Sequence, residues 1–142
     1  MMKNKQVAVS FVAVFALLTV AAGATRPSAD EFGLGPRVSA RSLYTATIIA
    51  PPQPIKARRL MKLQVSIRDA AGNPVDGAQI EVDGGMPQHG HGLPTKPRVT
   101  RSLGDGQYEI EGLRFNMGGW WELHLTVQSS AGADRVTFNL EV

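Results

Sequence analysis

The stretch that decides the fold is Leu60-Met61-Lys62-Leu63-Gln64-Val65-Ser66-Ile67. Its apolar residues Leu63, Val65 and Ile67 alternate with polar ones, so they share one face of an extended chain. Successive side chains of a β-strand point to opposite faces, and this period of two is typical of a half-buried strand. The stretch therefore predicts a strand over residues 60–67 that packs on a core.

The same kind of pattern recurs along the chain between turn-forming residues. Asp105-Gly106 predicts a tight hairpin, because Asp-Gly tolerates the positive φ that such turns need. Seven short strands without helical periodicity predict an all-β fold, an immunoglobulin-like antiparallel β-sandwich of about seven strands over residues 43–142. Besides 60–67, the predicted strands are residues 43–49, 78–82, 99–103, 107–110, 121–127 and 136–140.

The first 24 residues have the order of a secretory signal peptide. Lys3 and Lys5 precede an apolar run over residues 7–22, and Ala22-Gly23-Ala24 offers small residues for cleavage. We expect cleavage after Ala24 and a periplasmic or otherwise extracytoplasmic location. The alternative is an uncleaved membrane anchor, since the run is only slightly shorter than the roughly 20 residues that span a bilayer.

Composition limits what the remaining chain can do. Residues 25–42 lack periodicity and predict a flexible tether, which leaves residues 43–142 as one domain. The chain has 15 Lys and Arg and 12 Asp and Glu, and two lysines fall within residues 1–24, which leaves 13 and a net charge of +1. A near-neutral chain with scattered charges does not predict a nucleic-acid partner. With no cysteine, a soft metal ion would have to be bound by Met or His.

Residues 84–95 interrupt the strand-and-turn pattern and concentrate possible metal ligands. Met86, His89 and His91 lie among four glycines. Imidazole and thioether together suit copper, and thioether favours Cu(I). In an extended loop, His89 and His91 would point the same way and could share one ion. Met117, in a second glycine-rich loop, is a further candidate ligand, so the predicted metal site consists of Met86, His89, His91 and Met117.

These residues also have interpretations that need no metal. The Gly-His loop could be a flexible surface connection, and Met117 could fill the end of the core. His124, on the polar face of a strand, is expected to be solvated. Glu109 and Glu111 are two apart on one strand face, where solvation at the strand edge explains them, and the sequence lacks the motifs of enzymes. We therefore expect no catalytic activity and no catalytic residues.

The residues resemble a known family. Gly85-Met86-Pro87-Gln88-His89-Gly90-His91-Gly92, Leu103-Gly104-Asp105-Gly106-Gln107-Tyr108 and Phe115-Asn116-Met117-Gly118-Gly119-Trp120 are similar to the YtkA-like domain, which is related to FixH-type proteins. The resemblance covers about residues 43–141. It implies an exported or membrane-tethered immunoglobulin-like domain in a group associated with copper handling, with Met86, His89, His91 and Met117 at the positions suspected of binding copper.

The sequence thus predicts a copper-binding or copper-delivery domain whose partner is a copper donor or acceptor protein of the envelope. A second hypothesis is a metal-free interaction module that docks a membrane or periplasmic partner through its glycine loops and sheet edge. A third is a small-molecule binder that uses Trp120 and Trp121 as an apolar platform.

Overall fold

The structure is a computed structural model that describes residues 23–142. The predicted signal peptide lies outside this range except for its last two residues, so its cleavage stays a prediction. Among the described residues, no helix combines the length and the apolar character needed to cross a membrane.

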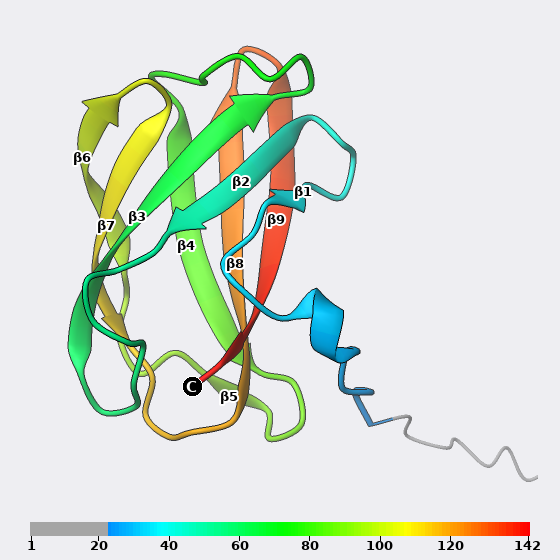
Figure 1. Ribbon diagram of the computed structural model, residues 1–142, viewed down its shortest axis with the longest axis vertical. Coiled ribbons are helices and arrows are strands. Elements are labelled where there is room, and N and C mark those ends of the chain that lie inside the picture. Colours follow the sequence, from blue (N-terminus) through cyan, green and yellow to red (C-terminus); the bar gives the residue numbers. More distant parts are fainter. Residues whose placement is uncertain (1–22) are drawn as a thin grey trace, which may run out of the picture.

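Within residues 23–142 the chain forms nine antiparallel β-strands and one short 3-10 helix, η1 (Ala29–Glu31) (Figure 1). The all-β prediction is confirmed. Seven of the strands correspond to the seven predicted ones, and the other two, β1 and β5, have two residues each. The strands are β1 (Arg37–Val38), β2 (Tyr44–Ile49), β3 (Leu60–Asp69), β4 (Gln79–Met86), β5 (His91–Gly92), β6 (Arg98–Gly104), β7 (Gln107–Arg114), β8 (Trp120–Ser129) and β9 (Gly132–Glu141).

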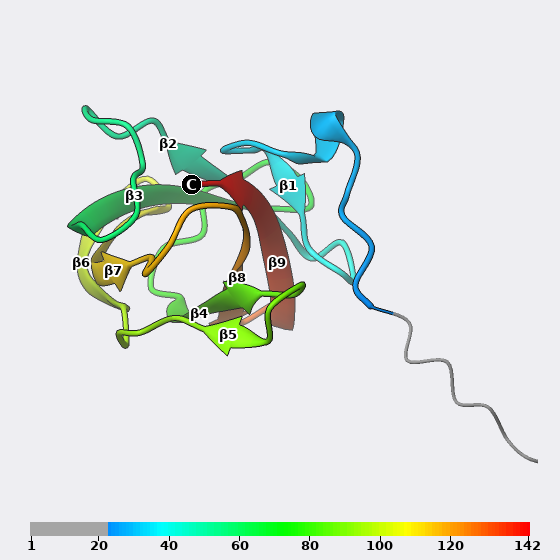
Figure 2. The ribbon, with the colours of Figure 1, turned by 90° about the horizontal axis from the view of Figure 1, so that it is seen from below.

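The strands form one strongly curled sheet in the order β1-β2-β3-β7-β6-β4-β8-β9, with β5 paired to β4. Strands β2 and β3 lie on one side of the interior, and β4 and β8 lie on the other (Figure 2). Strands β6 and β4 are joined by a single residue pair, Glu81 with Arg98. The two halves of the sheet therefore face each other as the layers of a sandwich, as predicted.

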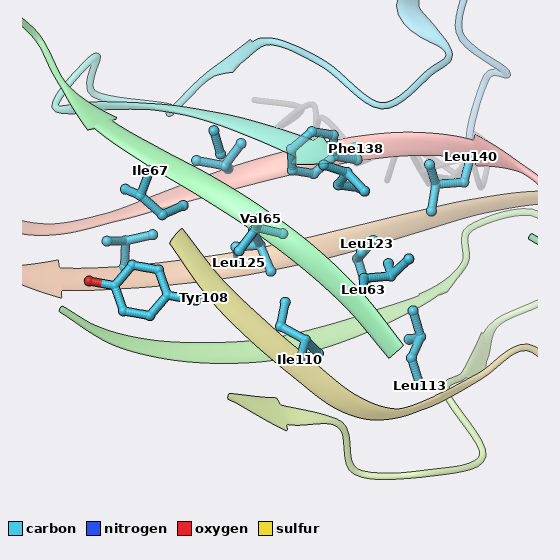
Figure 3. Close-up of a cluster of buried hydrophobic side chains, with 14 of the residues drawn as sticks. Leu63, Val65, Ile67, Tyr108, Ile110, Leu113, Leu123, Leu125, Phe138 and Leu140 are labelled. Atoms are coloured by element: carbon cyan, nitrogen blue, oxygen red, sulfur yellow. The ribbon is translucent and has the colours of Figure 1, made fainter. Parts of the chain in front are cut away.

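The core lies between these layers, and the alternating residues of β3 point into it (Figure 3). Leu63, Val65 and Ile67 are at most 1% exposed. They pack in one cluster with apolar residues of the facing strands, among them Leu125 and Phe138. The period of two in residues 60–67 thus places three apolar side chains inside. Full burial of each contributes about 1.5–3 kcal/mol to the stability of the fold.

The hairpin predicted at Asp105-Gly106 is confirmed. It joins β6 to β7, and φ is 51° at Asp105 and 68° at Gly106. The turn is also held from outside, because the Gly106 N–H donates to the Asp76 carboxylate at 2.8 Å. A side chain at Gly106 would overlap the carbonyl oxygen of Ile67, so this position requires glycine for space as well as for φ.

The segment expected to be a tether, residues 25–42, differs from that expectation over its second half. Strand β1 pairs with β2, and Phe32 forms a parallel bridge with Asn139 of β9. The Leu34 carbonyl accepts a hydrogen bond from the Ile48 N–H at 2.6 Å, and the Ala40 N–H donates to the Arg135 carbonyl at 2.9 Å. The open edges of β2 and β9 offer backbone groups that need partners. The segment supplies them and closes the sandwich along this side.

Strand β4 is longer than predicted. Part of the expected loop over residues 84–95 is paired backbone: β4 continues to Met86, and Gly85 and Met86 pair with β5. Only residues 87–90 form the loop between the two strands. Sequence reasoning missed this because two glycines break the apolar alternation, whereas in the structure they allow close contact between strands.

Candidate metal site

The two loops that carry the predicted ligands lie at the same end of the sandwich (Figure 1). Residues 87–90 join β4 to β5, and residues 115–119 join β7 to β8. Strand β4 pairs with β8 as far as Gly85 with Glu122, so the end of β4 lies beside the start of β8. This pairing brings Met86 next to the second loop.

His89 and His91 are both exposed, and their ring centroids are 5.9 Å apart with the planes tilted by 30°. The turn between them is fixed by the Met86 carbonyl, which accepts hydrogen bonds from the N–H groups of His89 at 3.0 Å and Gly90 at 2.9 Å. Metal–imidazole bonds are about 2 Å long, so two rings at this separation can both reach one ion between them. The structure thus brings these two predicted ligands together.

Gly84 and Gly85 explain how the loop is folded back onto the sheet. A Cβ atom at Gly84 would lie 2.5 Å from the Glu122 carbonyl oxygen, and one at Gly85 would lie 2.7 Å from the His91 carbonyl oxygen. Real Cβ atoms do not approach backbone oxygen so closely, so side chains here would push β5 and β8 away from β4. Glycine permits this close backbone approach.

Met86 is a core residue and not a loop residue as expected. It is 2% exposed and belongs to the main hydrophobic cluster. Its Cε atom lies against the backbone of Gly119, where an added Cβ would be 3.0 Å away. The thioether of Met86 therefore ends at the loop that carries Met117.

Met117 is partly buried and packs against the same cluster. Its carbonyl accepts a hydrogen bond from the Trp121 indole N–H at 3.0 Å. Gly119 exchanges two backbone hydrogen bonds with Val142, at 2.8 and 3.0 Å, so the end of the chain also holds this loop. Both thioether residues are thus at the base of the candidate site, whereas both imidazoles are on its surface.

His124 is more enclosed than expected for a solvated histidine. Its side chain is 16% exposed, and Nδ1 lies 3.1 Å from Oγ1 of Thr137. It lines a shallow depression of about 330 Å³ together with His91, Asp83 and Arg135. Burial lowers the pKa of His124, Arg135 lowers it further, and Asp83 acts in the opposite direction. Sequence reasoning missed this because the neighbouring strand β9 supplies the enclosure.

No three His, Asp or Glu side chains of residues 23–142 are grouped so that they could hold a metal ion. The candidate site is instead defined by two imidazoles and two thioethers.

The sequence suggested that solvation at the strand edge explains Glu109 and Glu111. In the structure both carboxylates form ion pairs instead. The Glu109 side chain is only 8% exposed, and Arg101 donates to its two carboxylate oxygens at 3.1 Å each. Lys62 lies 2.7 Å from the Glu111 carboxylate, and its hydrogen bond lowers the pKa of Glu111. The neighbouring strands β3 and β6 supply both cations, which the sequence of β7 alone does not reveal.

Trp120 and Trp121 do not form a surface platform. They are 4% and 0% exposed, and the Trp121 ring packs edge-on against Phe115 with centroids 5.1 Å apart. The Trp120 indole N–H donates to the Asn139 side chain at 2.9 Å. Trp121 and Phe115 belong to the core cluster, and Trp120 is buried outside it, so the hypothesis of an exposed aromatic binding surface is wrong.

A family model described as YtkA-like matches residues 40–126, a span that contains all four predicted ligands. No curated protein and no solved structure gave a match.

Proposed function

We propose that this chain, which belongs to the YtkA-like family, is an extracytoplasmic domain that binds copper through His89, His91, Met86 and Met117. The observation that carries the proposal is the pair of exposed imidazoles with ring centroids 5.9 Å apart, one in the loop that follows Met86 and one at the start of β5. The family match agrees with the resemblance to the YtkA-like domain, which implies copper handling, and the signal-like N-terminus supports export.

The chemistry of the four side chains fits copper. Imidazole binds copper in either common oxidation state, and thioether sulfur prefers the soft Cu(I) ion, whereas hard ions such as calcium prefer oxygen ligands. A bound copper ion would supply a redox-active or transferable metal centre. The chain contains no cysteine, so thioether is the sulfur ligand that it can offer.

The four ligands differ in accessibility, and this difference suggests an order of binding. His89 and His91 are exposed, whereas Met86 is 2% exposed and Met117 is partly buried. In this proposal the imidazoles meet the ion first. The thioethers of Met86 and Met117 would complete the ligand set from the base of the site, where the Met86 methyl group lies against Gly119. An exposed pair of imidazoles would also allow a copper donor or acceptor protein to approach the ion.

The test is a titration of residues 25–142 with Cu(I) against a competing chelator under reducing conditions. We expect stoichiometric binding that is lost in His89→Ala and His91→Ala and weakened in Met86→Leu and Met117→Leu. Met61→Leu is a matched control that removes a methionine outside the candidate site, and we expect it to bind as the wild type does.

Absence of Cu(I) binding by the folded wild-type domain would reject the proposal. The metal-free interaction module would then remain, and the same replacements in the two loops should weaken the capture of an envelope partner without changing metal content.

A further inference from the structure

Leu60, the first residue of β3, is the most exposed large hydrophobic residue among residues 23–142, at 70%. The start of β3 lies at the end of the sandwich where the 87–90 and 115–119 loops are found (Figure 1). A leucine so exposed, in a chain that buries its other leucines of β3, β7 and β8, needs a separate explanation.

Basic residues lie next to Leu60 in the chain and on the neighbouring segments. Arg58 and Arg59 precede Leu60 in the chain, and Arg114 is its partner across the β3–β7 pair. Lys96 and Leu60 line one surface depression. All four are exposed, and none of them forms an ion pair with a carboxylate within the described part of the chain. We call Leu60 with Arg58, Arg59, Lys96 and Arg114 the basic end.

The acidic residues nearby are already engaged with other cations. Glu111 pairs with Lys62 at 2.7 Å. Arg98, which also lines the depression beside Leu60, is flanked by Glu111 and Glu81 on the neighbouring strands. Glu111 and Glu81 are thus matched in number by Lys62 and Arg98, and the four cations of the basic end remain as a positive surface in a nearly neutral domain.

The backbone at the basic end is held in an unusual conformation. Arg58 has φ of 64°, which is costly for a residue with a side chain, on the order of 1–3 kcal/mol. Its N–H donates to the Phe115 carbonyl at 2.7 Å, which fixes the β2–β3 loop against the β7–β8 loop. Arg58 and Arg59 are thereby held at the surface next to Leu60.

The N-terminal side of the described chain reaches the same end of the molecule. Arg26 pairs with Glu141, whose strand ends beside Trp120 and the 115–119 loop. Glu141 also lines a depression with Pro51, Pro52 and Pro54, and the same prolines line a second one with Arg59 and Leu60. The chain that enters at Arg26 is preceded by the apolar run of residues 7–22.

From these relationships we infer that the basic end docks on an anionic lipid surface, with Leu60 inserted among the acyl chains and the four cations among the headgroups. An apolar residue next to Lys and Arg is the combination that binds membrane interfaces, and each cation near an anionic surface contributes about 1 kcal/mol. In the uncleaved alternative, the apolar run of residues 7–22 would precede Arg26 at this same end of the domain. Docking in this orientation turns the His89 and His91 loop toward the membrane, although the inference does not depend on copper binding.

Co-sedimentation of residues 25–142 with lipid vesicles tests the inference. All buried core residues lie between Ser39 and Leu140, so this fragment retains the complete core, and circular dichroism would verify folding of each variant. We expect binding to vesicles of phosphatidylcholine with phosphatidylglycerol and no binding to phosphatidylcholine alone. Added salt should weaken the binding, because it screens exposed charges.

Variants of exposed residues locate the binding surface. Arg59→Glu and Arg114→Glu should each weaken partitioning by at least about fivefold, and Leu60→Ser by about tenfold. There are two matched controls. Arg68→Glu reverses the charge of an arginine that pairs with Asp105 at the β6–β7 turn. Val38→Ser removes another exposed apolar side chain, which is 63% exposed. Both controls should bind as the wild type does.

Two results would overturn the inference. One is absence of binding to the anionic vesicles, including the case in which the basic end binds an acidic protein instead. The other is a loss in Arg68→Glu or Val38→Ser as large as in the basic-end variants, which would indicate nonspecific charge attraction. The copper titration is independent of both, since none of these residues is a proposed copper ligand.

Discussion

The methyl carbon of Met86, at the end of β4, lies against the backbone of Gly119 in the β7–β8 loop, where an added Cβ atom would be only 3.0 Å away. Gly119 in turn is hydrogen-bonded to Val142 in both directions. One proposed thioether ligand is therefore positioned by a loop that is itself held by the end of the chain, and this arrangement leads to the first prediction.

Gly119→Ala should disturb Met86 as well as the backbone. Gly119 has φ of 123°, which side chains rarely adopt, and Gly33 has a similar φ of 131° but nothing within 4 Å of its Cβ position. Both Ala variants should lose about 1–3 kcal/mol from backbone strain. Gly119→Ala should lose more and should also weaken Cu(I) binding, as measured by urea unfolding and chelator competition. Equal effects of the two substitutions would show that the contact with Met86 has no consequence.

Met86→Leu and Met86→Ala separate packing from metal binding. Leucine nearly conserves the buried volume and should cost less than about 1.5 kcal/mol of unfolding free energy. Alanine leaves a cavity and should cost about 2–5 kcal/mol. Both variants lack the thioether, so both should bind Cu(I) more weakly than the wild type. Unchanged affinity in Met86→Leu would remove Met86 from the proposed ligand set and leave it as a core residue.

Tyr108→Phe should destabilise the fold without changing its shape. The Tyr108 hydroxyl, in a residue that is 2% exposed, donates to the Val75 carbonyl at 2.6 Å and accepts from the Ala78 N–H at 3.0 Å. Removal of the hydroxyl leaves the Val75 carbonyl and the Ala78 N–H without this partner. Each lost partner should lower the free energy of unfolding by about 1–3 kcal/mol. Chemical unfolding should show a lower midpoint with the same slope; a midpoint equal to that of the wild type would contradict the prediction.

His124 should make the protein less stable in mildly acidic solution. Burial, and then Arg135, lower its pKa in the folded state, against the opposing effect of Asp83. The unfolded chain then binds the proton more readily, so the free energy of unfolding should fall as the pH drops below about 6.5. His124→Gln removes this group and should flatten the profile between neutral pH and the lowered pKa. Parallel profiles of the wild type and the variant, from urea unfolding at a series of pH values, would contradict this expectation.

The intact mass of the exported protein should show whether the signal peptide is cleaved. Cleavage after Ala24 predicts that the exported protein begins at Thr25, and intact-mass measurement of protein from the extracytoplasmic fraction would verify it. A protein that retains residues 1–24 and sediments with membranes would instead support the anchored form. In both forms Arg26 remains available for its ion pair with Glu141.

Much of the fold could be predicted because its signals are local. The alternation in residues 60–67 and the Asp105-Gly106 turn each depend on a few neighbouring residues, and strand periodicity and turn φ angles act at that range. The limits of β4 could not be predicted in this way. Gly84 and Gly85 are poor strand residues by propensity, and they belong to a strand here because β5 and β8 approach too closely for a side chain.

The sequence by itself determined the all-β class, the composition of the candidate ligand set and the family resemblance, because residue types and their spacing carry this information directly. Only the tertiary structure decided where these residues lie. It placed His89 and His91 together on the surface, buried Met86 beneath Gly119, enclosed His124 beside β9 and gathered four cations near Leu60. The physical reason is that burial and charge compensation depend on neighbouring strands that are distant in the chain, and no local pattern contains them.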